Sequence, residues 1–152
     1  MSPVEATISG SAAAVADPAT TRLTVLYDER CAFCIRCRDW LLSQACLLPV
    51  ALLPAGSSAA RDRFGTLPWR GKELIVIDDR GRAWVGAAGF VMCLWATARY
   101  RAWAYRLARP ALAHHTERFF RFVSTRRDRW SRWFEGDDCA YCDENPFFWE
   151  EA

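Results

Sequence analysis

The sequence lacks the patterns of several common enzyme classes. It has no glycine-rich phosphate loop, no paired catalytic carboxylates and no Ser/His/Asp arrangement. It has only two histidines, His114 and His115, and neighbouring residues on a helix point in different directions, so the two cannot easily bind one metal ion. The net charge is only +2, so the chain as a whole does not indicate a nucleic-acid partner, and we expect none.

Signals for export and for membrane insertion are also missing. The start, Met-Ser-Pro-Val-Glu, has neither a basic segment nor an apolar one. The longest apolar run, residues 83–98, contains glycines and is too short to cross a bilayer comfortably. We therefore expect a cytoplasmic protein without a transmembrane segment. In that compartment the seven cysteines more often serve redox or metal chemistry than structural bridging.

Composition divides the chain into three parts. Residues 1–20 are rich in Ala, Ser and Thr and have no periodicity, which predicts a disordered leader. Residues 21–134 have the patterning of one domain. Residues 135–152 form an acidic tail, whereas the charges of residues 99–132 are nearly all arginines. We expect the tail to lie on the basic helix; the alternative is a basic surface that meets RNA or anionic lipid.

Hydrophobic periodicity predicts the order β-α-β-α-β-β-α, followed by one more helix. Apolar or β-branched runs predict strands at residues 23–27, 50–53, 74–77 and 82–85. Helical spacing and capping residues predict helices at about 32–46, 58–64, 87–108 and 111–134. The apolar face expected for the last helix consists of Leu112, Phe119, Val123, Trp130 and Phe134. This order predicts an α/β protein with a thioredoxin-like core, a four-stranded mixed sheet and an extra C-terminal helix.

Cys31 and Cys34 occupy the point where the first strand ends and the first helix begins. Two cysteines at this spacing can close a small ring, and the positive end of the helix dipole stabilises a thiolate there. The position favours a redox pair in which Cys31, the more accessible thiol, is the nucleophile and Cys34 resolves the mixed disulfide. Arg30 and Arg36 are expected to lower the thiol pKa, and Asp28 is a candidate proton acceptor.

The other cysteines have several interpretations. Cys37 extends the pair to Cys-x-x-Cys-x-x-Cys, a spacing also found in iron–sulfur proteins, but helical apolar spacing favours a buried core residue. The same interpretation applies to Cys46 and Cys93. Cys139 and Cys142 form a second Cys-x-x-Cys among acidic residues, which disfavour a thiolate and suit a divalent metal or a bridge that fastens the tail. Together with Cys31 and Cys34 they could complete a Cys₄ zinc site, which is the main alternative to redox chemistry.

Three stretches resemble the DCC family of predicted thiol–disulfide oxidoreductases, small bacterial proteins with a thioredoxin-like fold. They are Tyr27-Asp28-x-x-Cys31-x-x-Cys34, the hairpin from Val76 to Gly81 with its continuation to Ala88, and the arginine- and aromatic-rich segment 122–130. The resemblance implies that Cys31 and Cys34 are the redox pair and that Asp28 matches an acidic signature residue. Glu29 stands where the family usually has glycine, and Arg30 where an acidic residue is common.

The sequence therefore predicts a thiol–disulfide oxidoreductase that needs no organic cofactor and acts on a thiol- or disulfide-bearing protein or small molecule. Besides the zinc-binding protein, the remaining alternative is a non-catalytic binding module that keeps the fold while its arginine-rich helix recruits an acidic partner.

Overall fold

The computed structural model describes residues 7–8, 19–65 and 74–134. The four predicted strands are present as β2 (Leu23–Tyr27), β3 (Val50–Pro54), β4 (Ile75–Asp78) and β5 (Arg82–Val85). The helices of the described part are α1 (Ala32–Leu42), α2 (Ser58–Phe64), α3 (Ala87–Ala96), α4 (Arg101–Leu107) and α5 (Pro110–Phe134). None of these helices combines the length and the apolar character needed to cross a bilayer.

The strands form one mixed sheet, as predicted. β2 pairs with β3 in parallel and with β4 in antiparallel orientation, and β4 pairs with β5 in antiparallel orientation. A strand of two residues, β1 (Thr7–Ile8), adds to the edge in parallel with β5 and gives the order β1-β5-β4-β2-β3. The expectation of a leader without structure is therefore wrong at these two residues, because they pair with backbone groups of the β5 edge. Residues 1–6 and 9–18 lie outside the described part.

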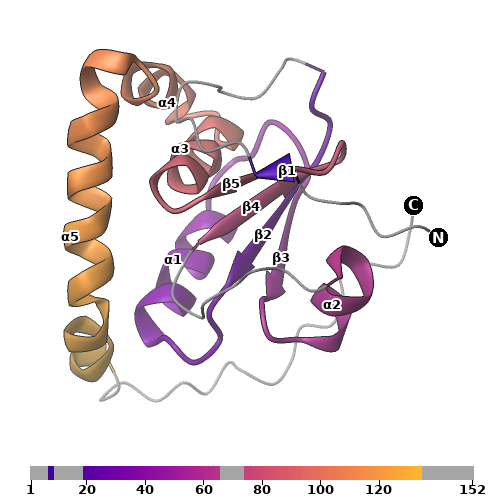
Figure 1. The fold of residues 1–152 in the computed structure, drawn as a ribbon, viewed down its shortest axis with the longest axis vertical. Helices are drawn as coiled ribbons and strands as arrows, with labels where there is room; N and C mark the ends of the chain where they lie inside the picture. Colours follow the sequence, from indigo (N-terminus) through magenta and orange to yellow (C-terminus); the bar gives the residue numbers. More distant parts are fainter. Residues whose placement is uncertain (1–6, 9–18, 66–73, 135–152) are drawn as a thin grey trace.

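Helices cover both faces of the sheet (Figure 1). Side chains alternate along a strand, so Leu23 and Val25 of β2 belong to the core beneath α1, α3 and α4, whereas Leu26 belongs to the smaller core beneath α2. The sequence offers Ser57 or Ser58 as the cap of α2, and it is Ser57 whose hydroxyl accepts the Ala60 N–H. This arrangement of mixed sheet, flanking helices and extra C-terminal helix is the predicted thioredoxin-like fold.

The turn between β4 and β5 is built around the buried carboxylate of Asp78. Its oxygens accept the backbone N–H groups of Arg80 and Arg82 and the guanidinium of Arg82, the last at 2.8 Å. Gly81 adopts φ 80°, which residues with a Cβ rarely adopt. The sequence Asp-Asp-Arg-Gly therefore makes the predicted hairpin.

Two predicted helices differ from the structure. The first ends at Leu42 rather than near Cys46, because Ser43 and Gln44 bond back to the Trp40 carbonyl. The predicted helix 87–108 is two helices, α3 and α4, broken at Thr97. Cys46 and Thr97 form an isolated antiparallel bridge, so Cys46 is exposed and outside any helix, contrary to the prediction. At the break, the Thr97 hydroxyl donates to the Leu94 carbonyl at 2.8 Å and accepts from the Tyr100 N–H at 3.2 Å.

Helix α5 forms an outer layer that packs on α1, α3 and α4 rather than on the sheet (Figure 1). The predicted apolar face is covered only in part. Val123 and Trp130 are half-buried, but Leu112 is 40% exposed and Phe119 is 60% exposed. Because α5 does not reach the sheet, its apolar side chains line open space between α5 and the helices below it.

Candidate active site

Cys31 is the N-cap residue of α1, at the position that the sequence predicts. Its backbone is extended, with φ −103° and ψ 107°, and its sulfur accepts the Cys34 N–H at 3.2 Å. An N-cap acceptor satisfies one of the free N–H groups at a helix start, and it lies at the positive end of the helix dipole. The same local geometry that begins the helix therefore stabilises negative charge on the Cys31 sulfur.

The expectation that Cys31 is the more accessible thiol is wrong. Cys31 is only 6% exposed, whereas Cys34 is half-buried. Capping is one cause of the low exposure of Cys31, since its sulfur turns toward the helix that it caps. The five cysteines of the described residues are free thiols: Cys31, Cys34, Cys37, Cys46 and Cys93.

The two thiols of the pair differ in their tendency to ionise. The hydrogen bond to Cys31 raises the pKa of Cys34 far above its ordinary value, and partial burial and the charge of Cys31 raise it further. Arg127 lowers the pKa of Cys34, whereas Asp28 raises it. In the reduced pair, the Cys34 thiol therefore holds its proton more tightly than an ordinary cysteine does.

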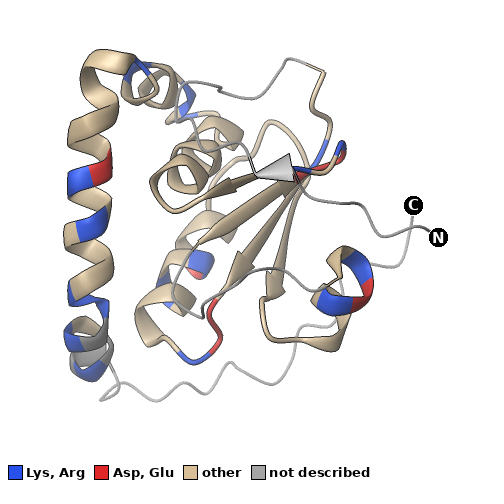
Figure 2. Cartoon of the chain, viewed as in Figure 1, with Lys and Arg blue, Asp and Glu red and all other residues tan. Residues whose placement is uncertain are grey.

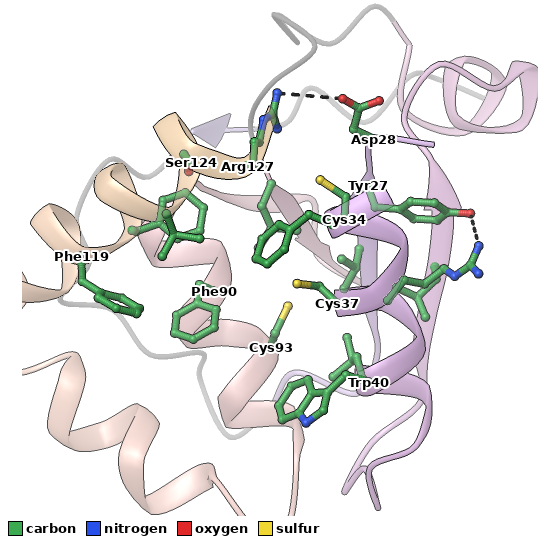
Figure 3. A pocket seen from close by; sticks show the side chains of 18 residues that line it. Tyr27, Asp28, Cys34, Cys37, Trp40, Phe90, Cys93, Phe119, Ser124 and Arg127 are labelled. Carbon is green, nitrogen blue, oxygen red and sulfur yellow. Dashed lines mark hydrogen bonds and ion pairs between the residues drawn. The ribbon is translucent and has the colours of Figure 1, made fainter. Parts of the chain in front are cut away.

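Arg127 of α5 is a buried cation beside the pair, and the sequence pattern did not indicate it. Arg127 is only 7% exposed, and its guanidinium lies 3.9 Å from the Asp28 carboxylate (Figure 3). The other Asp28 oxygen accepts the Arg30 N–H at 3.0 Å. Arg30 and Arg36, which we expected to lower the thiol pKa, are exposed and are not among the groups that act on Cys34. The sequence feature that could have pointed to Arg127 was the resemblance of segment 122–130 to the DCC family. Nothing in that segment, however, distinguishes Arg127 from Arg126.

A largely apolar cavity of about 180 Å³ opens beside the pair. Its polar end holds Asp28, Ser124 and Arg127, and its walls come from the sheet and from α1, α3 and α5 (Figure 3). Cys34 lines this cavity, but Cys31 is not among the lining residues. Cavities of roughly this volume accept a molecule the size of a benzene ring. Whatever enters would thus contact the second thiol of the pair.

Two further thiols, Cys37 and Cys93, line the same cavity and point into the same part of it (Figure 3). Cys93 is buried, as predicted, but Cys37 is exposed on the cavity wall, so its assignment to the core is wrong. The apolar surroundings raise the pKa of Cys37 to about 11, with a further contribution from the charge of Cys31. Burial raises the pKa of Cys93 to about 12, and the charges of Cys37 and Cys46 add to this. Neither thiol is ionised near neutral pH.

The described residues do not test the proposed metal site. Cys139 and Cys142 lie outside the described part, as does the whole acidic tail. Among the described residues, no group of three or more His, Cys, Asp or Glu side chains is arranged to hold a metal ion. His114 and His115 are exposed. Figure 2 shows arginines along α5 with few acidic side chains among them, in agreement with the basic helix predicted from the sequence.

Fold and site together define a class of protein: a thioredoxin-like domain with a Cys-x-x-Cys pair at the start of its first long helix. Comparison with protein families narrows this class. The model of the DCC1-like thiol-disulfide oxidoreductase family matches residues 25–133, and the chain belongs to that family. Comparison with curated proteins and with solved structures gave no match.

Proposed function

We propose that the protein exchanges thiols and disulfides through Cys31 and Cys34, with Cys31 as nucleophile and Cys34 as resolving thiol. The observation that carries the proposal is the unequal pair: the Cys31 sulfur accepts the Cys34 N–H at the start of α1, and the hydrogen bond to Cys31 raises the pKa of Cys34. A thiolate is the nucleophile of exchange. The attacking sulfur is therefore Cys31, although Cys34 is the more exposed residue.

The first step forms a mixed disulfide. The Cys31 thiolate attacks one sulfur of the substrate disulfide, the substrate S–S bond breaks, and the other substrate sulfur leaves as a thiolate. In the second step, Cys34 attacks the Cys31 sulfur, the bond to the substrate breaks, and the substrate leaves with both sulfurs reduced. Two electrons have then passed from the pair to the substrate, and no organic cofactor is needed.

Activation of Cys34 follows from the first step. Once Cys31 is bonded to the substrate, its negative charge is gone, and with it the charge and the thiolate hydrogen bond that raised the pKa of Cys34. Arg127 still favours the Cys34 thiolate. Asp28 lines the cavity together with Cys34 and is the proton acceptor that we propose for this step. The resolving thiol thus becomes reactive only after the substrate is attached.

Single-turnover reduction of a peptide disulfide with a fluorophore and quencher tests the proposal. We expect Cys31→Ser to abolish the reaction, and Cys34→Ser to stop it at a mixed disulfide that mass spectrometry locates on Cys31. Cys46→Ser is the matched control, because Cys46 is an exposed thiol outside any helix. Substantial activity in Cys31→Ser, or a mixed disulfide on another cysteine, would refute the assignment.

A further inference from the structure

We propose that the cavity beside Cys34 binds the organic group of the substrate, and that this substrate is a small disulfide whose sulfur carries an uncharged, ring-sized apolar group. This inference rests on the proposed function and names the substrate class of that site. Three features of the cavity support it: the aromatic walls, the pairing of the charges at its polar end, and its size together with its position beside the redox pair.

The walls of the cavity favour an aromatic ligand. Five aromatic side chains from α1, α3 and α5 line it: Phe33, Trp40, Phe90, Phe119 and Phe120. Two of these rings, those of Phe90 and Phe120, already contact one another in a tilted arrangement, with centroids 6.3 Å apart. Aromatic rings attract further rings in such contacts, beyond the gain from burying apolar area. A free thiol behaves as a small apolar group, so Cys37 and Cys93 keep the space between these rings apolar.

The charged side chains at the cavity already have partners of opposite charge. Asp28 and Arg127 form an ion pair at 3.9 Å. Arg38 pairs with Asp39 at 2.7 Å and donates to the Tyr27 hydroxyl at 3.2 Å. A charged ligand would lose its hydration against the apolar walls and would have to compete with these pairs for a partner. An uncharged ligand bears neither cost.

The size of the cavity limits the ligand to one ring. An apolar cavity of about 150 Å³ holds benzene, and this cavity measures about 180 Å³. One half of a small disulfide therefore enters, and the other half stays outside. Because Cys34 is itself a lining residue, a ring that fills the cavity lies next to the redox pair, and its sulfur is attached directly or through one carbon. A peptide backbone, whose polar groups need hydrogen-bond partners, does not fit these walls.

The Cys34 end of the cavity is also close to Cys31, whose sulfur is 3.2 Å from the Cys34 nitrogen. A ligand held there presents its ring-bearing sulfur to the Cys31 thiolate, and such positioning accelerates the attack. The Cys31 thiolate attacks this sulfur, the substrate S–S bond breaks, and the outer half leaves as a thiolate. Cys34 gives its proton to Asp28 and attacks the Cys31 sulfur. The bond to the ring-bearing sulfur then breaks, and the second half leaves as a thiolate.

Small disulfides that differ in one property test the substrate class. The rate constant for single-turnover reduction of each disulfide by the reduced wild-type protein is divided by its rate constant with dithiothreitol, which removes differences in intrinsic reactivity. We expect this ratio to be at least about tenfold higher for diphenyl disulfide than for bis(hydroxyethyl) disulfide, because the cavity buries the ring. Dithiodibenzoate, which adds a carboxylate to the same ring, should lose most of this advantage.

Filling the cavity tests the site itself. Val123→Phe adds a ring to the cavity wall from α5 and should lower the ratio for diphenyl disulfide about tenfold. Thr125→Phe is the matched control, because threonine has the shape of valine, but Thr125 is exposed on the same helix and is not a lining residue of this cavity. This control should keep the wild-type ratio. If Val123→Phe does not fold, toluene provides the test in the wild-type protein, where it should compete with diphenyl disulfide.

Four outcomes overturn the inference. One is a ratio for diphenyl disulfide no higher than that for bis(hydroxyethyl) disulfide, and another is an equal ratio for dithiodibenzoate. The third is a folded Val123→Phe that keeps the wild-type ratio, or a wild-type protein that toluene does not inhibit. The fourth is a higher ratio for a peptide disulfide with phenylalanine beside its cysteine, which would make the substrate a peptide.

Reduction of bis(hydroxyethyl) disulfide separates these results from a failure of the proposed function. The preference for a ring can be absent while the wild-type protein still reduces this disulfide through Cys31 and Cys34. If the proposed function is wrong, the pair reduces none of these disulfides.

Discussion

Replacement of Arg127 by methionine removes the buried cation of the active site while keeping an unbranched apolar stem. Arg127 does not belong to the Cys-x-x-Cys motif, and it acts from α5 on a thiol of α1. According to our mechanism, its charge matters in the second step, when Cys34 must ionise. We therefore expect Arg127→Met to slow resolution of the mixed disulfide and to leave its formation by Cys31 less affected.

The structure sets the size of the effect. Two unit charges 3.9 Å apart, the distance between Arg127 and Asp28, interact by about 4 kcal/mol at an effective dielectric of 20. Asp28 keeps the Arg30 N–H bond and some exposure, so we expect a loss of about 2 kcal/mol of stability, less than the ~3–5 kcal/mol typical when a buried pair loses one partner. For Cys34, each ~1.4 kcal/mol of lost thiolate stabilisation lowers the thiolate fraction about tenfold. Because a less acidic thiolate is the better nucleophile, the net slowing of resolution is about three- to fourfold.

Acid quench at successive times, followed by mass spectrometry, measures the mixed disulfide directly. In Arg127→Met it should accumulate, whereas in the wild-type protein it should pass quickly to products. Arg126→Met is the matched control, because Arg126 is the preceding residue of the same helix but is exposed and lies over the Phe122 ring at 4.3 Å. Equal accumulation in both variants, or none in Arg127→Met at a temperature where it is folded, would refute the role of Arg127.

Two further predictions concern stability, and urea unfolding measures both. Thr97→Val preserves the shape of a residue that is 0% exposed but removes its two hydrogen bonds at the break between α3 and α4. We expect the free energy of unfolding to fall by about 1–3 kcal/mol. A fall smaller than the error of the measurement would show that the break does not depend on this hydroxyl. Burial raises the pKa of Cys93 from 9.0 to about 12, so the unfolded chain releases this proton at lower pH than the folded chain does. The contribution of Cys93 to stability should fall by about 1.4 kcal/mol per pH unit between pH 9 and 12. Cys93→Ala should therefore lose less stability than the wild-type protein between pH 8 and pH 10, and an identical loss would contradict the assignment.

Features fixed by neighbouring residues were predictable from the sequence. The hairpin between β4 and β5 depends on Asp78 and Gly81, which are three residues apart, and helix α2 depends on Ser57 and Gly65 at its two ends. The position of Cys31 is equally local, since a residue between a strand and a helix becomes the N-cap of that helix. Capping and turn formation need no knowledge of the rest of the fold.

Features fixed by contacts between distant segments were not predictable. Residues 87–108 have continuous helical character, but the helix breaks at Thr97, where the segment around Cys46, fifty-one residues earlier in the chain, pairs with it. Cys37 has helical apolar spacing, but α5 leaves a cavity over it instead of covering it. In both cases the sequence has the local helical pattern, but contacts with distant segments of the chain decide the structure that forms.

The same distinction explains why the redox pair was evident from the sequence while its electrostatics were not. The helix start identifies both cysteines, but their reactivity depends on which charges are buried beside them. Arg30 and Arg36 are neighbours of the pair in the sequence but are exposed, and screening by solvent and salt weakens the effect of an exposed charge. Arg127 is ninety-three residues from Cys34 and acts on it because the fold buries its guanidinium there. Local residues, Cys31 and Asp28, and one distant residue, Arg127, therefore act on Cys34 together, and only the distant one could not be found from the motif.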